Sequence, residues 1–155
     1  MISDLAPWQM VHASTSAVVT GTTVMVDDDT IPQNTEGNEV LTATITPTNA
    51  ANRVLITANV FHSAALTACN VITALFQDST ANALAAVAQE KPNDANAPFI
   101  TTLTHEMAAG TTSATTFKIR AGANSGGTWT LNGWGAARRF GGVASTTLTI
   151  TEIAT

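Results

Sequence analysis

The sequence predicts an all-β domain, either a β-sandwich or a jelly roll, with eight or nine antiparallel strands. Apolar and polar residues alternate with period two through most of the chain, and turns rich in Gly, Pro and Asn separate these stretches. The 155 residues also include 28 Thr and 27 Ala. Threonine favours strands because its branched side chain is stiff and suits a pleated surface. The length fits one domain with a sizeable core.

The clearest strands lie in residues 111–153, where two Gly-rich turns separate three of them. We expect these strands at residues 116–121, 128–134 and 146–150. In each, alternation directs one set of side chains to a buried face and leaves Thr, Lys and Arg in water. The predicted core of these strands consists of Phe117, Ile119, Trp129, Leu131, Leu148 and Ile150.

The N-terminal part of the chain divides into an arm and the start of the folded domain. Residues 1–15 show no clean periodicity and predict an arm, so the domain is expected to cover residues 16–155. Residues 16–27 predict a first strand in which Gly21 marks a bulge or bend. A turn-rich loop is expected at residues 27–39.

The middle of the chain predicts five further strands. They are expected at residues 40–46, 53–61, 69–78, 82–89 and 99–107. The segment 53–61 is the most apolar and is predicted to be central. By propensity alone residues 82–89 suit a helix or a strand, and their context favours a strand.

Charge and targeting signals exclude several classes of protein. A net charge of −5 argues against nucleic-acid binding, which needs a basic stripe. Charged residues make up only 11% of the chain, so we expect other subunits to cover much of the surface. A single cysteine, Cys69, excludes an intrachain disulfide and is compatible with a reducing cytosol. The sequence shows no signal peptide and no membrane-spanning run, which predicts a soluble protein made inside a cell.

Several motifs occur in order over about residues 16–153: DDDTIPQNTEG, ITPTNAANRVLI, ALFQDSTANALAA, GTTSATTFKIR and ARRFGG followed by STTLTITEI. Together they resemble a family of phage and prophage virion proteins that occur as tail-fibre-terminal domains and as small structural proteins. The resemblance implies a trimeric jelly roll like that of tumour necrosis factor, without catalytic activity. The fold prediction is therefore an antiparallel β-sandwich of jelly-roll type with about eight strands, assembled as a homotrimer.

Few residues suggest site chemistry. Asp27, Asp28 and Asp29 offer oxygen ligands that suit calcium, but their spacing matches no EF-hand, and a solvated turn is favoured. His105 is predicted on the inward face of its strand as a structural histidine, and near a trimer axis it would make assembly pH-sensitive. Cys69 is read as a small buried hydrophobe. We expect no cofactor, no metal and no catalytic residue.

Two groups are candidates for contacts with partners. Trp134 and Phe140 flank Arg138 and Arg139, and this combination suits a subunit interface in which arginine pairs with a carboxylate. A solvated loop is an equal alternative for the two arginines. Pro7, Trp8 and Met10 lie in the arm, where an aromatic side chain has little local core to enter. We therefore expect them to anchor the arm in a partner protein.

The predicted function is that of a non-enzymatic virion protein on the particle exterior, made in the cytoplasm of the host bacterium. The favoured interpretation is a capsid decoration protein that contacts the major capsid protein and stabilises the shell. The alternative is a fibre tip, attached to a tail or fibre protein, that binds a polysaccharide or protein of the host surface. Decoration is favoured because the sequence contains no shaft, neither collagen-like triplets nor heptads nor β-helix repeats.

Overall fold

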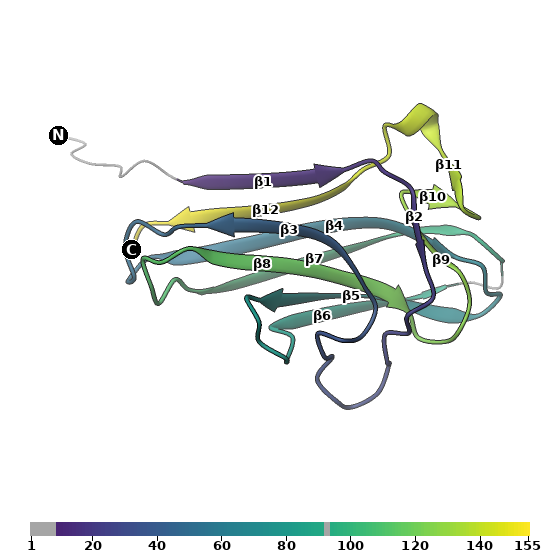
Figure 1. The fold of residues 1–155 in the computed structure, drawn as a ribbon, viewed down its shortest axis with the longest axis horizontal. Coiled ribbons are helices and arrows are strands. Elements are labelled where there is room, and N and C mark those ends of the chain that lie inside the picture. The colour runs from purple at the N-terminus through teal and green to yellow at the C-terminus, as the bar shows by residue number, and fades with distance from the viewer. Residues whose placement is uncertain (1–8, 92–93) are drawn as a thin grey trace.

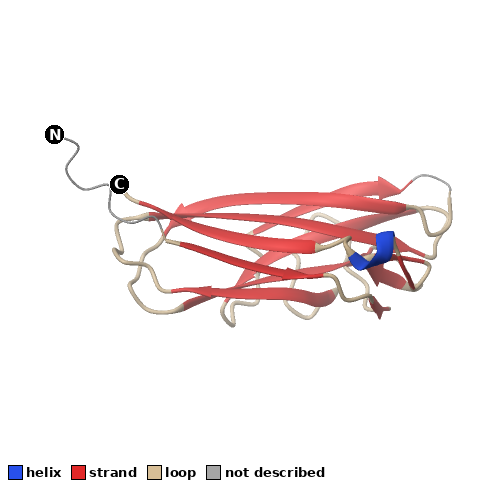
Figure 2. Ribbon diagram, turned by 90° about the horizontal axis from the view of Figure 1, so that it is seen from above, coloured by secondary structure: helices blue, strands red, loops and turns tan. Residues whose placement is uncertain are grey.

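Two antiparallel sheets face each other in the computed structural model, which describes residues 9–91 and 94–155 (Figures 1 and 2). In the first sheet β1, β12, β4 and β7 are neighbours in that order, and the short β9–β2 pair extends it beside the far end of β4. The second sheet has the order β3-β8-β5-β6. The strands are β1 Met10–Thr15, β2 Val19–Gly21, β3 Asn38–Ile45, β4 Arg53–Ala64, β5 Cys69–Gln77, β6 Ala85–Lys91, β7 Pro98–Ala108, β8 Thr115–Ala123, β9 Trp129–Leu131, β10 Gly133–Trp134, β11 Ala137–Arg138 and β12 Thr146–Ile153; the 3-10 turn η1 is Phe140–Gly142. This is the predicted sandwich of jelly-roll type.

The core lies between the two sheets and contains the side chains that alternation predicted. Phe117, Ile119, Trp129, Leu131, Leu148 and Ile150 are all buried in one cluster. Strand β4 is central, as predicted, because β12 and β9 pair with one of its edges and β7 with the other. The ambiguous segment before residue 91 is strand β6, so the prediction of a strand is confirmed.

The N-terminal arm is shorter than predicted. Met10–Thr15 forms strand β1 and pairs with β12 from Met10↔Thr151 to Thr15↔Thr146. Val11 and Ala13 face inward and pack against the core. The prediction of an arm up to residue 15 is therefore wrong for residues 10–15, where the alternation covers only six residues. Pro7 and Trp8 lie outside the described residues.

The predicted first strand at residues 16–27 is wrong for most of its length. Only Val19–Gly21 is a strand, and the chain then crosses to the other sheet, where Met25 N–H donates to the Ala123 carbonyl at 3.0 Å. A Cβ at Gly21 would lie 2.2 Å from the Asn38 side chain, so glycine allows the close passage at the start of this crossing.

The crossing segment buries a second apolar surface, on the outer face of β5. Met25 is fully buried there and packs with Ile72, Ala74 and Phe76. Strand β5 is consequently buried on both faces, which explains why apolar residues occupy consecutive positions along it. The inner face of the same strand carries Leu75 into the main core.

Candidate functional site

A bend at Asn132 directs the chain out of the first sheet. Residues 128–134 were predicted as one strand, but Asn132 has φ +52° and separates β9 from β10. Its buried side-chain amide donates to the main-chain carbonyls of Thr15 and Ala17 at 2.8 and 3.1 Å, and its oxygen accepts from Thr146 Oγ1 at 3.0 Å. Asparagine tolerates this left-handed conformation better than most residues. The bend is thus fixed by three hydrogen bonds.

Beyond the bend the chain forms a small protrusion. Strands β10 and β11 pair as a hairpin whose two turn residues, Gly135 and Ala136, have φ of +58° and +62°, as in a type I′ turn. The 3-10 turn η1 follows, and in it Gly142 has φ +94°. A Cβ at Gly142 would lie 3.1 Å from Cδ of Arg138, so this arginine lies against the glycine.

The protrusion carries a group of exposed apolar and basic side chains, which we call the hairpin patch. Trp134 is 36% exposed, Phe140 72% and Val143 82%. The Arg139 guanidinium lies 4.8 Å from the centre of the Trp134 ring, within the range of a cation–π interaction. Neither Arg138 nor Arg139 forms a salt bridge within residues 9–91 and 94–155. The patch consists of Trp134, Arg138, Arg139, Phe140 and Val143.

The structure therefore gathers the four residues Trp134, Arg138, Arg139 and Phe140 on one projection, and Val143 joins them. Aromatic side chains and arginine are enriched at the centres of protein interfaces. The protrusion lies at the end of the sandwich away from the start of β1 and the end of β12 (Figure 1). Its chemistry is suited to binding, and its role as a subunit interface stays a prediction.

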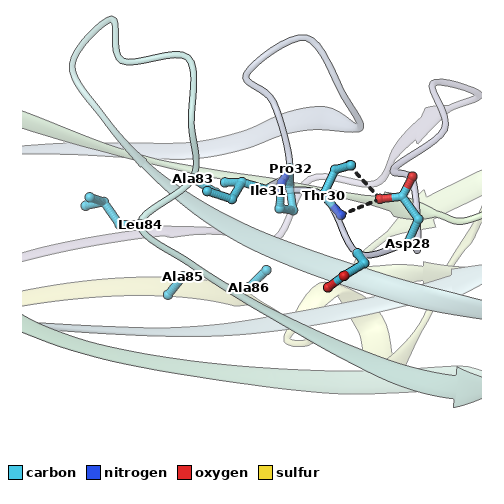
Figure 3. A pocket seen from close by; sticks show the side chains of 9 residues that line it. Asp28, Thr30, Ile31, Pro32, Ala83, Leu84, Ala85 and Ala86 are labelled. Atoms are coloured by element: carbon cyan, nitrogen blue, oxygen red, sulfur yellow. Dashed lines mark hydrogen bonds between the residues drawn. The ribbon is translucent and has the colours of Figure 1, made fainter.

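The loop at residues 27–37, which we call the aspartate loop, forms one wall of a groove of about 400 Å³ beside the start of β6 (Figure 3). Asp28 Oδ1 accepts hydrogen bonds from Thr30 Oγ1 at 2.5 Å and from Thr30 N–H at 2.8 Å. These bonds lower the pKa of Asp28 below its usual value, so the carboxylate stays ionised. Asp27 instead accepts a hydrogen bond from the Asn70 amide. Within the described residues no three His, Cys, Asp or Glu side chains converge as metal ligands.

The fully buried histidine is His62, whereas His105 is only partly buried. His62 is fully buried, and this burial lowers its pKa to about 3. Its Nδ1 accepts from Trp129 Nε1 at 3.0 Å, and its Nε2 lies 3.3 Å from Thr101 Oγ1. Thr101 contacts Thr73 Oγ1 at 2.6 Å, so the chain of polar groups joins the two sheets. Extending the alternation of 54, 56, 58 and 60 by one step would have indicated that His62 points inward.

The remaining residues singled out in the sequence are His105, Cys69 and Met10. His105 faces inward on β7, as predicted, and is half-buried in the row that contains Ile56 and Ile150. Cys69 is buried, in agreement with its interpretation as a small hydrophobe. Met10 is 65% exposed at the start of β1. The described residues include no helix with the length and apolar character needed to span a membrane.

Glu152 is a buried carboxylate that sequence reasoning missed. Burial acts to raise its pKa, but hydrogen bonds from Asn52, from Thr48 and from the Asn49 main chain outweigh it and lower the pKa. Asn52 Nδ2 donates to Glu152 Oε1 at 2.7 Å, and the N–H and hydroxyl of Thr48 each donate to it at 2.8 Å. Glu152 thereby fastens the loop between β3 and β4 to the last strand.

The outer face of the β1-β12-β4-β7 sheet is nearly free of charge. One row across it, set by the strand register, consists of His12, Thr149, Thr57 and Thr104. The charged pair on this face is Arg53 with Glu106, and it lies at one end of the sheet. The threonine hydroxyls of the sheet's outer face, together with the exposed Ile100, make this face suitable for contact with another subunit.

Residues 18–155 match the model of a protein family described as the Pgp3 C-terminal domain. The chain belongs to this family. Strand β1 lies before the matched residues. No curated protein matches the chain significantly.

Among solved structures, the chain is similar to Eiger TNF from S. frugiperda, with a TM-score of 0.55 and 11% identity over 96% of this chain and 94% of that one. It also matches the EclA C-terminal domain, described as a sugar-binding protein, with a TM-score of 0.40, 18% identity and coverage of 78% and 76%. A structure of infectious bursal disease virus, Gx strain, matches with a TM-score of 0.45, 11% identity and coverage of 97% and 38%.

The TNF-like jelly roll that the resemblance implied is confirmed. The family match names Pgp3, a chlamydial virulence protein, and not a phage virion protein. The matches establish the family and the fold, and the finer prediction of a phage virion protein stays a prediction.

Proposed function

We propose that this chain is a non-enzymatic, homotrimeric binding module on the exterior of a virion, and that it recognises a partner through the hairpin patch. The observation that carries the proposal is the grouping of Trp134, Arg139 and Phe140 at the end of the sandwich away from the start of β1. A module held near its N-terminal strand would present this patch outward. Exposed aromatic side chains, beside guanidinium groups that form no salt bridge with any described residue, suit a protein or polysaccharide of the host surface.

Two observations support assembly as a trimer. The first is the outer face of the β1-β12-β4-β7 sheet, which is nearly free of charge and which an isolated monomer would expose to water. The second is the low charge of the whole chain, 11% of residues. Three copies would also present three hairpin patches together, which multiplies a weak contact through effective concentration.

A capsid decoration protein is the second candidate. Met10 favours it, because this methionine is 65% exposed at the start of β1 and follows Pro7 and Trp8 in the sequence. In that case the anchor comprises the residues before β1 and the start of β1 itself. The partner would then be the major capsid protein.

The test compares the parent protein with the double variant Trp134→Ser/Phe140→Ser in two assays. One is cosedimentation with cells of the host species, and the other is binding to particles stripped of the protein. A binding module loses adsorption to cells in the double variant and still attaches to particles. If adsorption is unchanged while removal of residues 1–9 abolishes attachment and weakens the shell, decoration replaces this proposal. If the double variant still adsorbs to cells and the protein without residues 1–9 still attaches to particles, both the binding module and the decoration protein are contradicted.

A further inference from the structure

Strand β6 forms an edge of the second sheet that contains neither a bulge nor a proline. Within residues 9–91 and 94–155, β5 is its one strand partner. Natural sheets protect such edges with bulges, prolines or inward charges, because unpaired N–H and C=O groups attract other strands. The register of β6 with β5 runs without a bulge from Ala85 to Lys91, and this segment contains no proline.

The hydrogen bonds of β5 show which of its residues face away from β6. The Asp78 N–H donates to the Thr116 carbonyl at 2.8 Å, and the Asn70 carbonyl accepts from the Asn124 N–H at 3.0 Å. Both contacts continue the register of β5 with β8. Because bonding alternates along an antiparallel strand, even-numbered residues of β5 bond to β8 and odd-numbered residues bond to β6.

The residues of β6 that face the free edge follow from this alternation. Thr73 is opposite Val87 in the register, so the odd-numbered residues of β6 bond to β5. Ala86, Ala88 and Glu90 therefore direct their main-chain N–H and C=O groups to the unpaired side. Ala86 and Ala88 carry small, exposed side chains that leave these groups accessible.

Two hollows follow this edge. The groove of about 400 Å³ is lined by the consecutive residues 83–86 and by residues 28–32 of the aspartate loop (Figure 3). A second hollow, of about 280 Å³, is lined by residues 87–89 and by residues 100–102 of β7. Successive side chains of a strand point to opposite faces, so a hollow lined by consecutive residues lies along the strand's edge. The two together follow the chain from the two residues before β6 to residue 89.

The charged side chains that line the two hollows are acidic. Asp28 and Asp29 line the first groove, and Glu90 is one of the residues that face the free edge. No lysine or arginine lines either hollow. Small apolar surface from Ala85, Ala86 and Ala88 makes up much of the rest. An extended segment that alternates small apolar residues with Lys or Arg complements both the main chain and the charge.

We propose that β6 is a docking edge to which an extended, basic segment of a partner protein adds as a further strand. Ala86, Ala88 and Glu90 supply the main-chain hydrogen bonds, while Asp28 and Asp29 bind the basic side chains. This site is separate from the hairpin patch and does not depend on the proposed function.

The probe is a fluorescein-labelled peptide in which lysine alternates with valine and threonine, and binding is measured by fluorescence anisotropy on the full chain. Ala88→Pro removes the one N–H that faces the edge at this position and keeps the β5–β6 hydrogen bonds. We expect the Kd to rise by roughly tenfold or more. The matched control, Ala88→Thr, keeps the N–H and should bind like the parent. Asp28→Asn/Asp29→Asn should weaken binding and reduce its dependence on salt.

A second probe guards against misfolding of the proline variant. It is the same peptide with alternate main-chain nitrogens methylated, which keeps its charge and prevents strand pairing. We expect this peptide to bind at least roughly tenfold more weakly to the parent protein. Equal binding of the two peptides, or unchanged binding by folded Ala88→Pro, would overturn the proposal. Trp134→Ser/Phe140→Ser should bind the peptide normally, because these residues lie outside the β6 edge. Loss of peptide binding at β6 is therefore distinguishable from loss of partner binding at the hairpin patch.

Discussion

Trp129 Nε1 donates a 3.0 Å hydrogen bond to His62 Nδ1 in the interior of the sandwich, and the two rings meet edge to face at 87°. The bond requires an unprotonated Nδ1, because a protonated ring nitrogen cannot accept a hydrogen bond. Both side chains are buried. His62 is therefore neutral in the folded protein.

Acid should destabilise the protein through His62. Its pKa is about 3 when folded and about 6.5 when unfolded, so below pH 6.5 the unfolded chain takes up a proton that the folded chain does not. Stability is full above pH 6.5 and should fall by about 1.4 kcal/mol per pH unit as pH decreases toward 3. Urea midpoints at pH 7.5, 6.0 and 5.0 measure this slope. His62→Gln should flatten this slope, and an equal slope in the parent and the variant would refute the assignment.

Glu152 should add a second loss of stability at lower pH. Its folded pKa is depressed by hydrogen bonds, so the stability that it contributes is present above its usual value of 4.5 and is lost as pH falls through the folded pKa. Glu152→Ala should cost about 3 kcal/mol at pH 7, because the donors of Thr48 and Asn52 lose their acceptor. Denaturant melts check this. A cost below about 1 kcal/mol would mean that water replaces the carboxylate.

Trp129 is buried and Trp134 is exposed, so truncating each of them provides a matched test of the core. Trp129→Ala should cost roughly 3–5 kcal/mol through lost burial and the cavity left behind. Trp134→Ala should change stability little, because this side chain lies on the protrusion outside the core. Thermal melts of both variants measure the difference. A small effect of Trp129→Ala would contradict its buried register.

Truncations should show where the folded domain begins. Removal of residues 1–9 should leave the fold intact, whereas removal of residues 1–15 deletes β1, its pairing with β12 and the buried contacts of Val11. The second deletion should cost roughly 2–4 kcal/mol. Circular dichroism melts of the two proteins test this. Equal stability would mean that β1 contributes nothing to the sheet.

Sedimentation equilibrium should give about three times the 16.0 kDa chain mass at micromolar concentration. Thr57→Arg places a charge in the centre of the uncharged sheet face and should yield monomers, since an unpaired charge in an interface is costly. Thr44→Arg is the matched control, because Thr44 is exposed on the other sheet beside Thr116. A soluble parent monomer would contradict the trimer. Dissociation by Thr44→Arg alone would place the interface on the second sheet.

The sequence by itself determined most of the long strands and most of the core. Period-two alternation is a local property, so it assigned Phe117, Trp129 and Ile150 to the inside without knowledge of any partner strand. It failed at Met10–Thr15, where the alternation is short and the stabilising partner, β12, lies at the other end of the chain. Pairing between distant strands cannot be read from local periodicity.

Only the tertiary structure decided the rest. Met25 lies in a stretch whose alternation predicts a strand, yet the chain there crosses to the other sheet and Met25 covers Phe76. It does so because the outer face of β5 is apolar and must be shielded from water. Asn132 breaks a predicted strand because its amide finds acceptors at Thr15 and Ala17, which lie far away in the sequence. The hairpin patch and the free edge of β6 likewise depend on which segments the fold brings together and which it leaves unpaired.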